Sequence, residues 1–206
     1  MPTPLPLWRG RCLDVELRCW RLPDAVGDVE RDLLSQDERE RAAGFKLERR
    51  RVEYVASRAY LRRALADVLG VVPSSIPISP DDAGKPQHAG GMQFNLSHSA
   101  NAVLIGWGAR PLGVDLEASQ RKTEHVARMR IVAEVRDAAS VSAIGAFTLA
   151  EAASKAIGRG LVAVRGLRLE KVVRQGEIEF LSGTQRIRAN VLAVPDSYVA
   201  AVAVLD

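Results

Sequence analysis

The chain has 206 residues, of which 47% are hydrophobic and 26% are charged, and its formal net charge is +4 at pH 7. These values exclude a disordered or fibrous protein, and the length allows one large domain or two small ones. The apolar runs are shorter than the ~18 residues of a membrane helix, and the N-terminus lacks the basic start and apolar core of a signal peptide. We therefore expect a cytoplasmic protein without a membrane segment.

The positive charge is compatible with nucleic acid, an acidic protein or a phosphorylated ligand as partner. In the most basic segment, arginines and lysines alternate with glutamates, which is more typical of a solvated helix face than of a nucleic-acid groove. The basic residues of this segment are Arg39, Arg41, Lys46, Arg49, Arg50, Arg51, Arg58, Arg62 and Arg63, and the acidic ones are Glu38, Glu40, Glu48 and Glu53.

The first predicted element is a half-buried strand over residues 11–22, in which Leu13, Val15 and Leu17 alternate with polar residues. Cys12 and Cys19 would lie on opposite faces of this strand, so a disulfide between them is not expected. The few cysteines and histidines also argue against a zinc site. We interpret both thiols as structural.

Two helices and a loop follow. Residues 35–38 are typical of a helix start, and a longer helix is predicted over residues 48–69, because apolar residues recur at three to four positions before Gly70 and Pro73. Residues 73–91 are rich in proline and glycine and predict an irregular loop.

The remaining elements alternate between strands and helices. Helical stretches are predicted near residues 124–139 and 145–157. Strands are predicted at residues 92–96, 102–107, 112–116, 167–173, 177–181, 185–189 and 198–204. Two pairs of apolar runs, in residues 94–107 and 191–204, are broken by a similar polar turn and indicate a weak internal repeat.

Two segments carry candidate metal ligands. Alternate side chains of a strand share a face, so Asp115 and Glu117 can hold one cation between them. Carboxylates are the ligands that hard divalent metals prefer. Taken alone, however, this pair is more typical of two acidic residues that face water at the end of a strand.

Glu151 and Lys155 lie one helical turn apart and add a third carboxylate and a cation that can meet a phosphate. Two other interpretations remain open. Residues 148–151 fit a capping box that would place Glu151 in the first turn of a helix. Glu151 and Lys155 could also form an exposed ion pair of small energy.

Short polar side chains gather near His98. Ser97 and Ser99 offer hydroxyl groups and Asn95 offers an amide, a set that suits a phosphate. A single histidine beside a turn is more often a hydrogen-bonded surface residue. Lys85 could likewise be a solvated loop lysine.

With these residues the chain resembles the Sfp-type 4'-phosphopantetheinyl transferases. The resemblance covers most of the chain and rests on four motifs in family order: G-K-P at residues 84–86, F-N-L-S-H-S at 94–99, G-V-D-L-E at 113–117 and F-T-L-A-E-A-A-S-K at 147–155. It implies an α+β pseudo-dimer of two similar halves, residues 1–108 and 109–206, packed as one unit with the active site in the cleft between them.

The resemblance also implies an activity. Members of the family move 4'-phosphopantetheine from coenzyme A to a serine of an acidic acyl or peptidyl carrier protein, use Mg2+ and release 3',5'-ADP. For this chain it implies a monomer in which Glu151 and Lys155 are catalytic. The implied metal ligands are Asp115, Glu117 and Glu151, and the implied coenzyme A contacts are Arg41, Arg51, Gly84, Lys85, Pro86, Ser97, His98, Asp115 and Lys155.

The chain departs from the family pattern at four positions. Phe147 stands for a tryptophan and Ala150 for a lysine, and Glu38 and Glu53 stand where basic residues would meet the 3'-phosphate. We expect Phe147 to fill the aromatic position and Ala150 to face solvent. A basic residue among 49–51 is expected to replace the missing phosphate contacts.

Two other function classes remain open at this point. A non-catalytic relative that binds coenzyme A as a regulator or partner subunit would explain the altered helix motif. A nucleic-acid-binding protein is indicated by charge alone, and a salt-dependent titration would test it.

Overall fold

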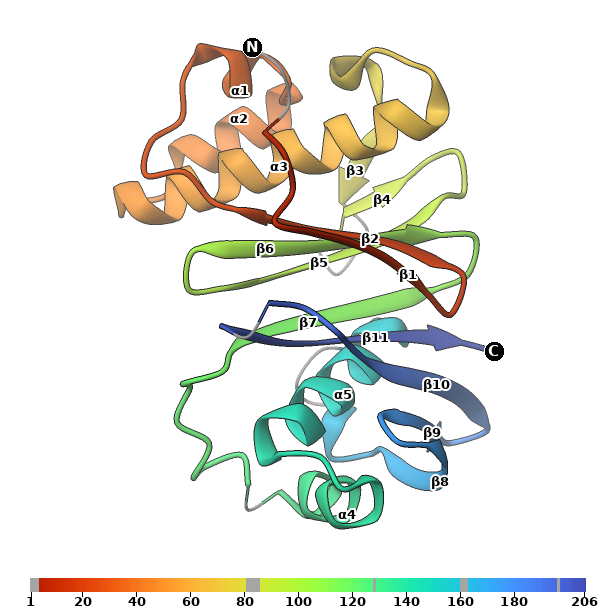
Figure 1. Ribbon diagram of the computed structural model, residues 1–206. Coiled ribbons are helices and arrows are strands. Elements are labelled where there is room, and N and C mark those ends of the chain that lie inside the picture. Colours follow the sequence, from red (N-terminus) through yellow and green to blue (C-terminus); the bar gives the residue numbers. More distant parts are fainter. Residues whose placement is uncertain (1–3, 81–85, 128, 160–162, 196) are drawn as a thin grey trace. The chain divides into compact units, whose positions relative to one another are not determined.

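The computed structural model describes residues 4–80, 86–127, 129–159, 163–195 and 197–206, which form a mixed fold of β-sheets and five α-helices (Figure 1). The chain divides into two compact units: the first consists of Met1–Pro6 and Trp20–Gly91, and the second of Leu7–Cys19 and Met92–Asp206. Residues 7–19, near the N-terminus, thus belong with the second unit. The internal similarity between residues 1–108 and 109–206 stays a prediction.

The first unit is mainly helical. Its longest element, α3 (Glu48–Leu69), confirms the predicted helix and ends at Gly70, whose φ of 67° is a left-handed conformation that glycine adopts without steric penalty. The predicted helix start is also confirmed, because Ser35 Oγ accepts a hydrogen bond from Glu38 N at the beginning of α2 (Gln36–Ala43). A short helix, α1 (Asp28–Asp32), precedes them.

The loop prediction for residues 73–91 is partly wrong. A 3-10 turn, η1 (Pro73–Ser75), is followed by two short antiparallel strands, β3 (Ile78–Pro80) and β4 (Pro86–His88). Strands of three residues are too short for alternation to stand out in a proline-rich segment. Gly84 and Lys85 lie outside the described residues.

The prediction of one strand over residues 11–22 is wrong. The segment belongs to a hairpin of β1 (Trp8–Cys12) and β2 (Val15–Arg21), which turns at Leu13 and Asp14 with φ values of 52° and 61°. Because the turn contains an apolar residue and no glycine, it continues the alternation of a strand. Cys12 and Cys19 therefore lie on different strands. Both are free, and burial raises the pKa of the Cys19 thiol to about 11, in keeping with a structural role.

The second unit contains two sheets. The four-stranded sheet has the order β1-β2-β6-β5 and the five-stranded sheet the order β7-β11-β10-β9-β8. The predicted strands are confirmed, with ends within three residues of the expected ones. They are β5 (Gln93–Ser99), β6 (Ala102–Gly108), β7 (Leu112–Ala118), β8 (Arg168–Arg174), β9 (Glu177–Ser182), β10 (Gln185–Leu192) and β11 (Tyr198–Leu205).

Two helices pack on the five-stranded sheet through a continuous apolar core. The first, α4 (Arg130–Ala139), is shorter than the predicted stretch 124–139, and turns precede it. The second, α5 (Ala143–Ala156), lies against β7 and β11 (Figure 1). None of the helices within the described part of the chain is long and apolar enough to span a membrane.

The alternative interpretation of residues 148–151 as a capping box does not hold. Ser142 caps α5 by accepting a hydrogen bond from Gly145 N, so the cap lies six residues before Thr148. Thr148 is buried inside the helix, where its Oγ1 donates to Ile144 O at 2.7 Å. Glu151 consequently lies in the third turn, away from the positive end of the helix dipole.

Candidate active site

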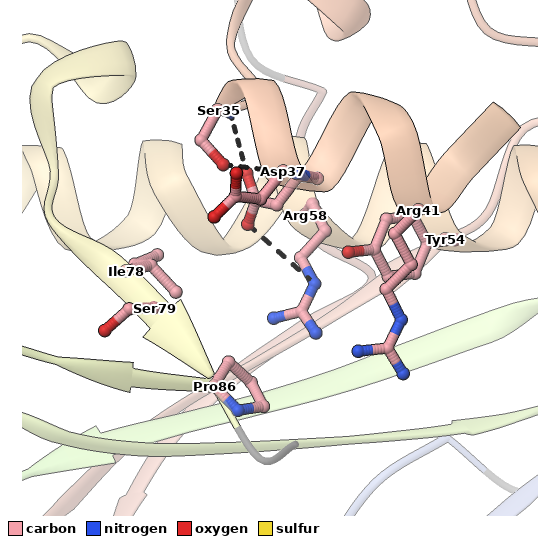
Figure 2. A pocket seen from close by; sticks show the side chains of 9 residues that line it. Ser35, Asp37, Arg41, Tyr54, Arg58, Ile78, Ser79 and Pro86 are labelled. Atoms are coloured by element: carbon pink, nitrogen blue, oxygen red, sulfur yellow. Dashed lines mark hydrogen bonds and ion pairs between the residues drawn. The ribbon is translucent and has the colours of Figure 1, made fainter. Parts of the chain in front are cut away.

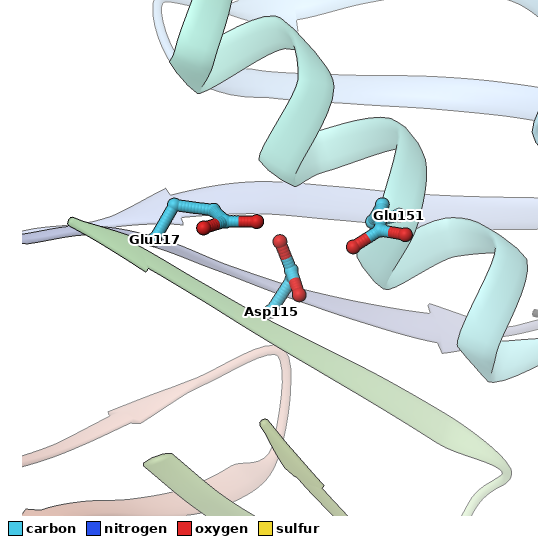
Figure 3. A group of neighbouring side chains, drawn as sticks. All are labelled: Asp115, Glu117 and Glu151. Atoms are coloured by element: carbon cyan, nitrogen blue, oxygen red, sulfur yellow. The ribbon is translucent and has the colours of Figure 1, made fainter. Parts of the chain in front are cut away.

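Three carboxylates meet where β7 faces α5 (Figure 3). Asp115 and Glu117 project from the same face of β7, and Glu151 approaches from α5. One oxygen from each side chain lies within 4.8 Å of the others. Asp115, in the middle of β7, and Glu117, near its end, are both buried. Glu151 is half-buried. The structure thus brings together the three predicted metal ligands, and their metal-binding role stays a prediction.

Gly113 allows this close approach. A Cβ atom at this position would lie 2.1 Å from Ala152 O and 2.6 Å from Ala156 N, both in the backbone of α5. Only a residue without a side chain can occupy the position while the helix stays where it is. Because Gly113 shares a face with Asp115, the glycine sets the distance between the strand carboxylates and Glu151.

Lys155 lies against this cluster from the next turn of α5. Its Nζ donates hydrogen bonds to Asp115 Oδ1 at 2.7 Å, to Ser97 Oγ at 3.1 Å and to the carbonyl oxygen of Val114 at 3.2 Å. These contacts differ from an exposed pair with Glu151, because the side chain reaches across to β7. A quarter of the side chain stays exposed, while its ammonium group is held by these three acceptors.

Side chains from β5 join the two sheets of this unit. Asn95 Oδ1 accepts a hydrogen bond from Val114 N, and Ser99 Oγ accepts one from Ala118 N, each at 2.9 Å. Because Asn95 and Ser99 are four residues apart on a strand, they use the same face. They therefore anchor both ends of the β7 segment that carries the carboxylates.

The two serines of β5 also contact the carboxylates directly. Ser97 Oγ donates to Asp115 Oδ1 at 2.9 Å, and Ser99 Oγ donates to Glu117 Oε2 at 3.2 Å. Ser97 is buried and engaged with Asp115 and Lys155, whereas His98 is exposed on the opposite face of β5. Ser97 and His98 are thus separated by the alternation of the strand, and the phosphate contacts predicted for them stay a prediction.

Arg121 also belongs to this cluster, although it was not among the residues predicted from the sequence. This residue forms an ion pair with Glu117, and its guanidinium lies 5.3 Å from the centre of the Phe147 ring. The position of Arg121 four residues after Glu117 was the one feature of the sequence that could have indicated this ion pair. Phe147 is 2% exposed and so occupies a buried aromatic position beneath a cation.

The expectation that Ala150 faces solvent is wrong. Ala150 is fully buried in the core between α5 and its neighbours. Eleven of the fourteen residues of α5 are buried, so the helix has only a narrow polar side. The pattern of apolar residues along α5 therefore does not indicate which of its small residues faces water.

The donor set fits a hard divalent cation. Asp115 is 1% exposed, and its Oδ2 atom has no hydrogen-bond partner among the described residues. A buried carboxylate oxygen left in this way is costly unless a cation or donor meets it. Carboxylate oxygens are the ligands that Mg2+ prefers in proteins. Asp115, Glu117 and Glu151 are therefore the residues that would hold the metal.

The crowding of carboxylates changes the titration of Glu151. Burial raises the pKa of Glu151 from 4.5 to about 7, and the negative charge of Asp115 adds to the rise. Lys155 and Arg121 oppose it with their positive charges. In the absence of a cation, Glu151 therefore holds a proton near neutral pH.

This titration predicts an unusual dependence of stability on pH. The pKa of Glu151 is raised in the folded state. The stability that this group adds to the folded protein is therefore fully present below pH 4.5 and is lost as the pH rises through about 7. In EDTA, the free energy of unfolding measured with urea should fall by about 1 to 2 kcal/mol between pH 4.5 and about 7 because of this group, after allowance for solvent screening. Mg2+ should offset the loss by stabilising the ionised carboxylate.

Glu151→Gln should remove this component of the pH dependence. The exposed Glu124→Gln serves as the matched control and should leave it unchanged. A Glu151→Gln protein with the same pH dependence as the parent chain would contradict the assignment.

The first unit contains a small pocket of about 60 Å3 (Figure 2). Two of the predicted ligand residues, Arg41 and Pro86, line it. Arg51 does not line it and forms an ion pair with Glu48 instead. Arg58, which the sequence analysis placed only in a general basic face, lines the pocket from α3. The other lining residues are Ser35, Asp37, Glu38, Tyr54, Ile78 and Ser79.

Comparison with known proteins adds one relative. A phosphopantetheinyl transferase from Thraustochytrium sp. is 33% identical to the chain over 154 residues. The chain is thus similar to a phosphopantetheinyl transferase. The match covers 62% of this chain and 54% of the relative, so the chain spans about half the length of that protein. No family model matches the chain. The relative supports the family resemblance drawn from the four motifs.

Proposed function

We propose that the protein transfers 4'-phosphopantetheine from coenzyme A to a serine of an acyl or peptidyl carrier protein, with Mg2+, and releases 3',5'-ADP. The observation that carries the proposal is the meeting of Asp115, Glu117 and Glu151 with Lys155 between β7 and α5. The printed name of the Thraustochytrium relative supports the same class of reaction. The metal ligands are Asp115, Glu117 and Glu151.

The side chains of the cluster have separate tasks in this reaction. When bound, Mg2+ lowers the negative charge of the pyrophosphate that opposes attack and stabilises the leaving 3',5'-ADP. Glu151 accepts the proton of the carrier serine, directly or through water. Lys155 presents its ammonium group to the leaving phosphate. No covalent bond to the protein is formed.

Serine and asparagine side chains keep these groups in place. Ser97 bonds to both Asp115 and Lys155, and Ser99 bonds to Glu117, so the carboxylates and the ammonium group need little reorganisation during the reaction. Arg121 offsets part of the negative charge of Glu117. The cluster is thereby held in a defined geometry despite the mutual repulsion of its carboxylates.

The remaining contacts with coenzyme A follow from the resemblance. Arg41 and Pro86 line the pocket of the first unit and are candidate contacts for the nucleotide part of the ligand. Gly84, Lys85, Ser97 and His98 stay candidate contacts on the strength of the motifs. The carrier protein is acidic, and the net charge of +4 favours its approach. We further propose a cytoplasmic monomer built from two similar halves, with the active site in the cleft between those halves.

A panel of apo-carrier proteins tests the proposal. Each carrier is incubated with the protein, coenzyme A and Mg2+ and analysed by intact-protein mass spectrometry. We expect at least one carrier to gain one phosphopantetheine group on its serine, and EDTA to prevent the gain. Binding of coenzyme A without modification of any carrier would instead support a non-catalytic relative.

A further inference from the structure

Arg121 brings a positive charge to the carboxylate cluster from the turn that follows β7. Its backbone N–H donates to Ala118 O at 2.9 Å, so a turn closes directly after the strand. The side chain lies back against the end of β7 and forms an ion pair with Glu117. The side chain of Arg121 is 38% exposed, whereas that of Glu117 is 8% exposed. A cation near the surface is thus paired with a buried carboxylate.

Both carboxylate oxygens of Glu117 already have a hydrogen-bond donor. Arg121 Nη1 donates to Oε1, and Ser99 Oγ donates to Oε2 at 3.2 Å. A divalent cation that binds Glu117 therefore meets one of these donors at either oxygen. Ser99 is neutral, and a carboxylate oxygen has lone pairs for a cation and a hydroxyl group together. Arg121 carries a full positive charge that repels an incoming cation at the same oxygen. Of the two contacts, the one with Arg121 opposes metal binding.

Lys155, another cation of the cluster, is held differently. It donates to three acceptors, of which one is Asp115 Oδ1 at 2.7 Å. The second oxygen of Asp115, Oδ2, has no hydrogen-bond partner among the described residues. A metal can therefore bind Asp115 through Oδ2 while Lys155 stays on Oδ1. Glu117 lacks this arrangement, because each of its oxygens accepts from a donor.

The ring of Phe147 gives the guanidinium group of Arg121 a second contact. The guanidinium carbon lies 5.3 Å from the ring centre, and Phe147 is 2% exposed. The attraction between a cation and a ring face extends to about 6 Å and does not depend on a single hydrogen-bond direction. Arg121 can therefore release Glu117 and still lie over Phe147. The released charge then stays beside the cluster (Figure 3).

We propose that Arg121 is a positioning residue of the metal site, an internal counter-ion that holds Glu117 until a divalent cation displaces it. The identity of this cation as Mg2+ rests on the proposed function. Without the cation, Arg121 compensates the charge of a buried carboxylate that lies close to two others. Metal binding breaks this ion pair, so Arg121 weakens the affinity for the metal while it keeps Glu117 in place. The affinity is thus set by Arg121 as well as by the three ligands.

Metal titration of the protein without coenzyme A tests this role. Mn2+ serves as the probe, because it takes the same oxygen ligands as Mg2+ and its free form is counted by electron paramagnetic resonance. The parent protein should bind one Mn2+ that Mg2+ displaces. Arg121→Gln should bind Mn2+ roughly 10-fold more tightly, because no charge-assisted contact to Glu117 has to break. Unchanged or weaker binding in Arg121→Gln would overturn the assignment.

Lys122→Gln is the matched control, since Lys122 is the next residue and is exposed. This substitution removes the same charge from the same segment, and the affinity for Mn2+ should stay within about twofold of the parent value. Arg121→Lys keeps a cation at the position and should restore weaker, parent-like binding. Arg121→Met keeps an unbranched stem without the charge and should match Arg121→Gln. An equal gain in Lys122→Gln would show that net charge alone sets the affinity and would overturn the proposal.

Thermal melting gives a result that a purely structural role would not produce. In EDTA, Arg121→Gln should melt about 2 to 4 °C below the parent protein, because Glu117 has lost its counter-ion. With saturating Mg2+ this difference should shrink or reverse, since the metal then neutralises Glu117 in both proteins. A difference that is the same in EDTA and in Mg2+ would mean that Arg121 only stabilises the fold, which would contradict the proposal.

Transfer assays run in parallel separate this inference from the proposed function. Tighter metal binding by Arg121→Gln, in a protein that modifies no carrier, would uphold the counter-ion and refute the transferase. Transfer by a protein whose metal affinity is independent of Arg121 would refute the counter-ion and uphold the transferase. Mn2+ binding that Asp115→Asn leaves unchanged would place the ion outside the cluster and overturn the counter-ion. A parent protein that binds no Mn2+ would also overturn it, whatever the transfer assay shows.

Discussion

Replacing Asp115 with asparagine should reduce phosphopantetheine transfer by on the order of 10³-fold while the protein stays folded. The substitution keeps the size of the side chain and an oxygen that can accept the Ser97 hydrogen bond. It removes the negative charge, the ion pair with Lys155 and the oxygen Oδ2, which has no hydrogen-bond partner in the described chain. A metal ligand is lost at the centre of the cluster, so both catalysis and Mg2+ affinity should fall.

Thermal melting and Mg2+ titration distinguish this loss from unfolding. The pKa of Glu151 should also fall in Asp115→Asn, because the charge of Asp115 is one cause of its rise. Asp137→Asn, on the exposed side of α4, is the matched control and should retain activity. Full activity of Asp115→Asn with unchanged Mg2+ dependence would contradict the assignment of Asp115 as a ligand.

Restoring the family lysine at Ala150 should destabilise the protein by about 3 kcal/mol or more. Ala150 is fully buried among apolar residues, where a lysine side chain overpacks the core and leaves an ammonium group without solvent. The sequence alone suggested that this change would be harmless. The structure reverses that expectation, because α5 is enclosed on most of its surface.

The same substitution at the exposed Ala138 of α4 is a suitable control. Ala138→Lys should change the free energy of unfolding by less than about 0.5 kcal/mol, as is usual for surface positions. Phe147→Trp should cost less than Ala150→Lys, because Phe147 already occupies an aromatic position beneath Arg121. Equal stability of Ala150→Lys and the parent chain would show that the core around α5 accommodates a charge.

Local sequence rules predicted the elements that carry the candidate site. The long helix of residues 48–69 was predicted to the residue, because its apolar period, Gly70 and Pro73 all agree. Strand alternation placed Asp115 and Glu117 on one face, and the helical spacing placed Lys155 one turn after Glu151. These features depend only on residues close together in the sequence.

Tertiary contacts could not be predicted in the same way. The meeting of Glu151 with Asp115 depends on the absence of a side chain at Gly113, which lets α5 approach β7. The contact of Arg121 with Glu117 and Phe147 depends on how a turn folds back onto the helix. The start of α5 lies two residues from the predicted one, but its cap was not predicted, because Ser142 precedes the more familiar pattern at Thr148.

The proposed transfer by the carboxylate cluster yields two products that one experiment can quantify. With a carrier protein that accepts the group, serine-bound phosphopantetheine and released 3',5'-ADP are quantified in the same reaction. We predict equal amounts of the two products, formed only when carrier protein and Mg2+ are both present and abolished in Asp115→Asn. A protein that binds coenzyme A but yields neither product with any carrier would contradict the account.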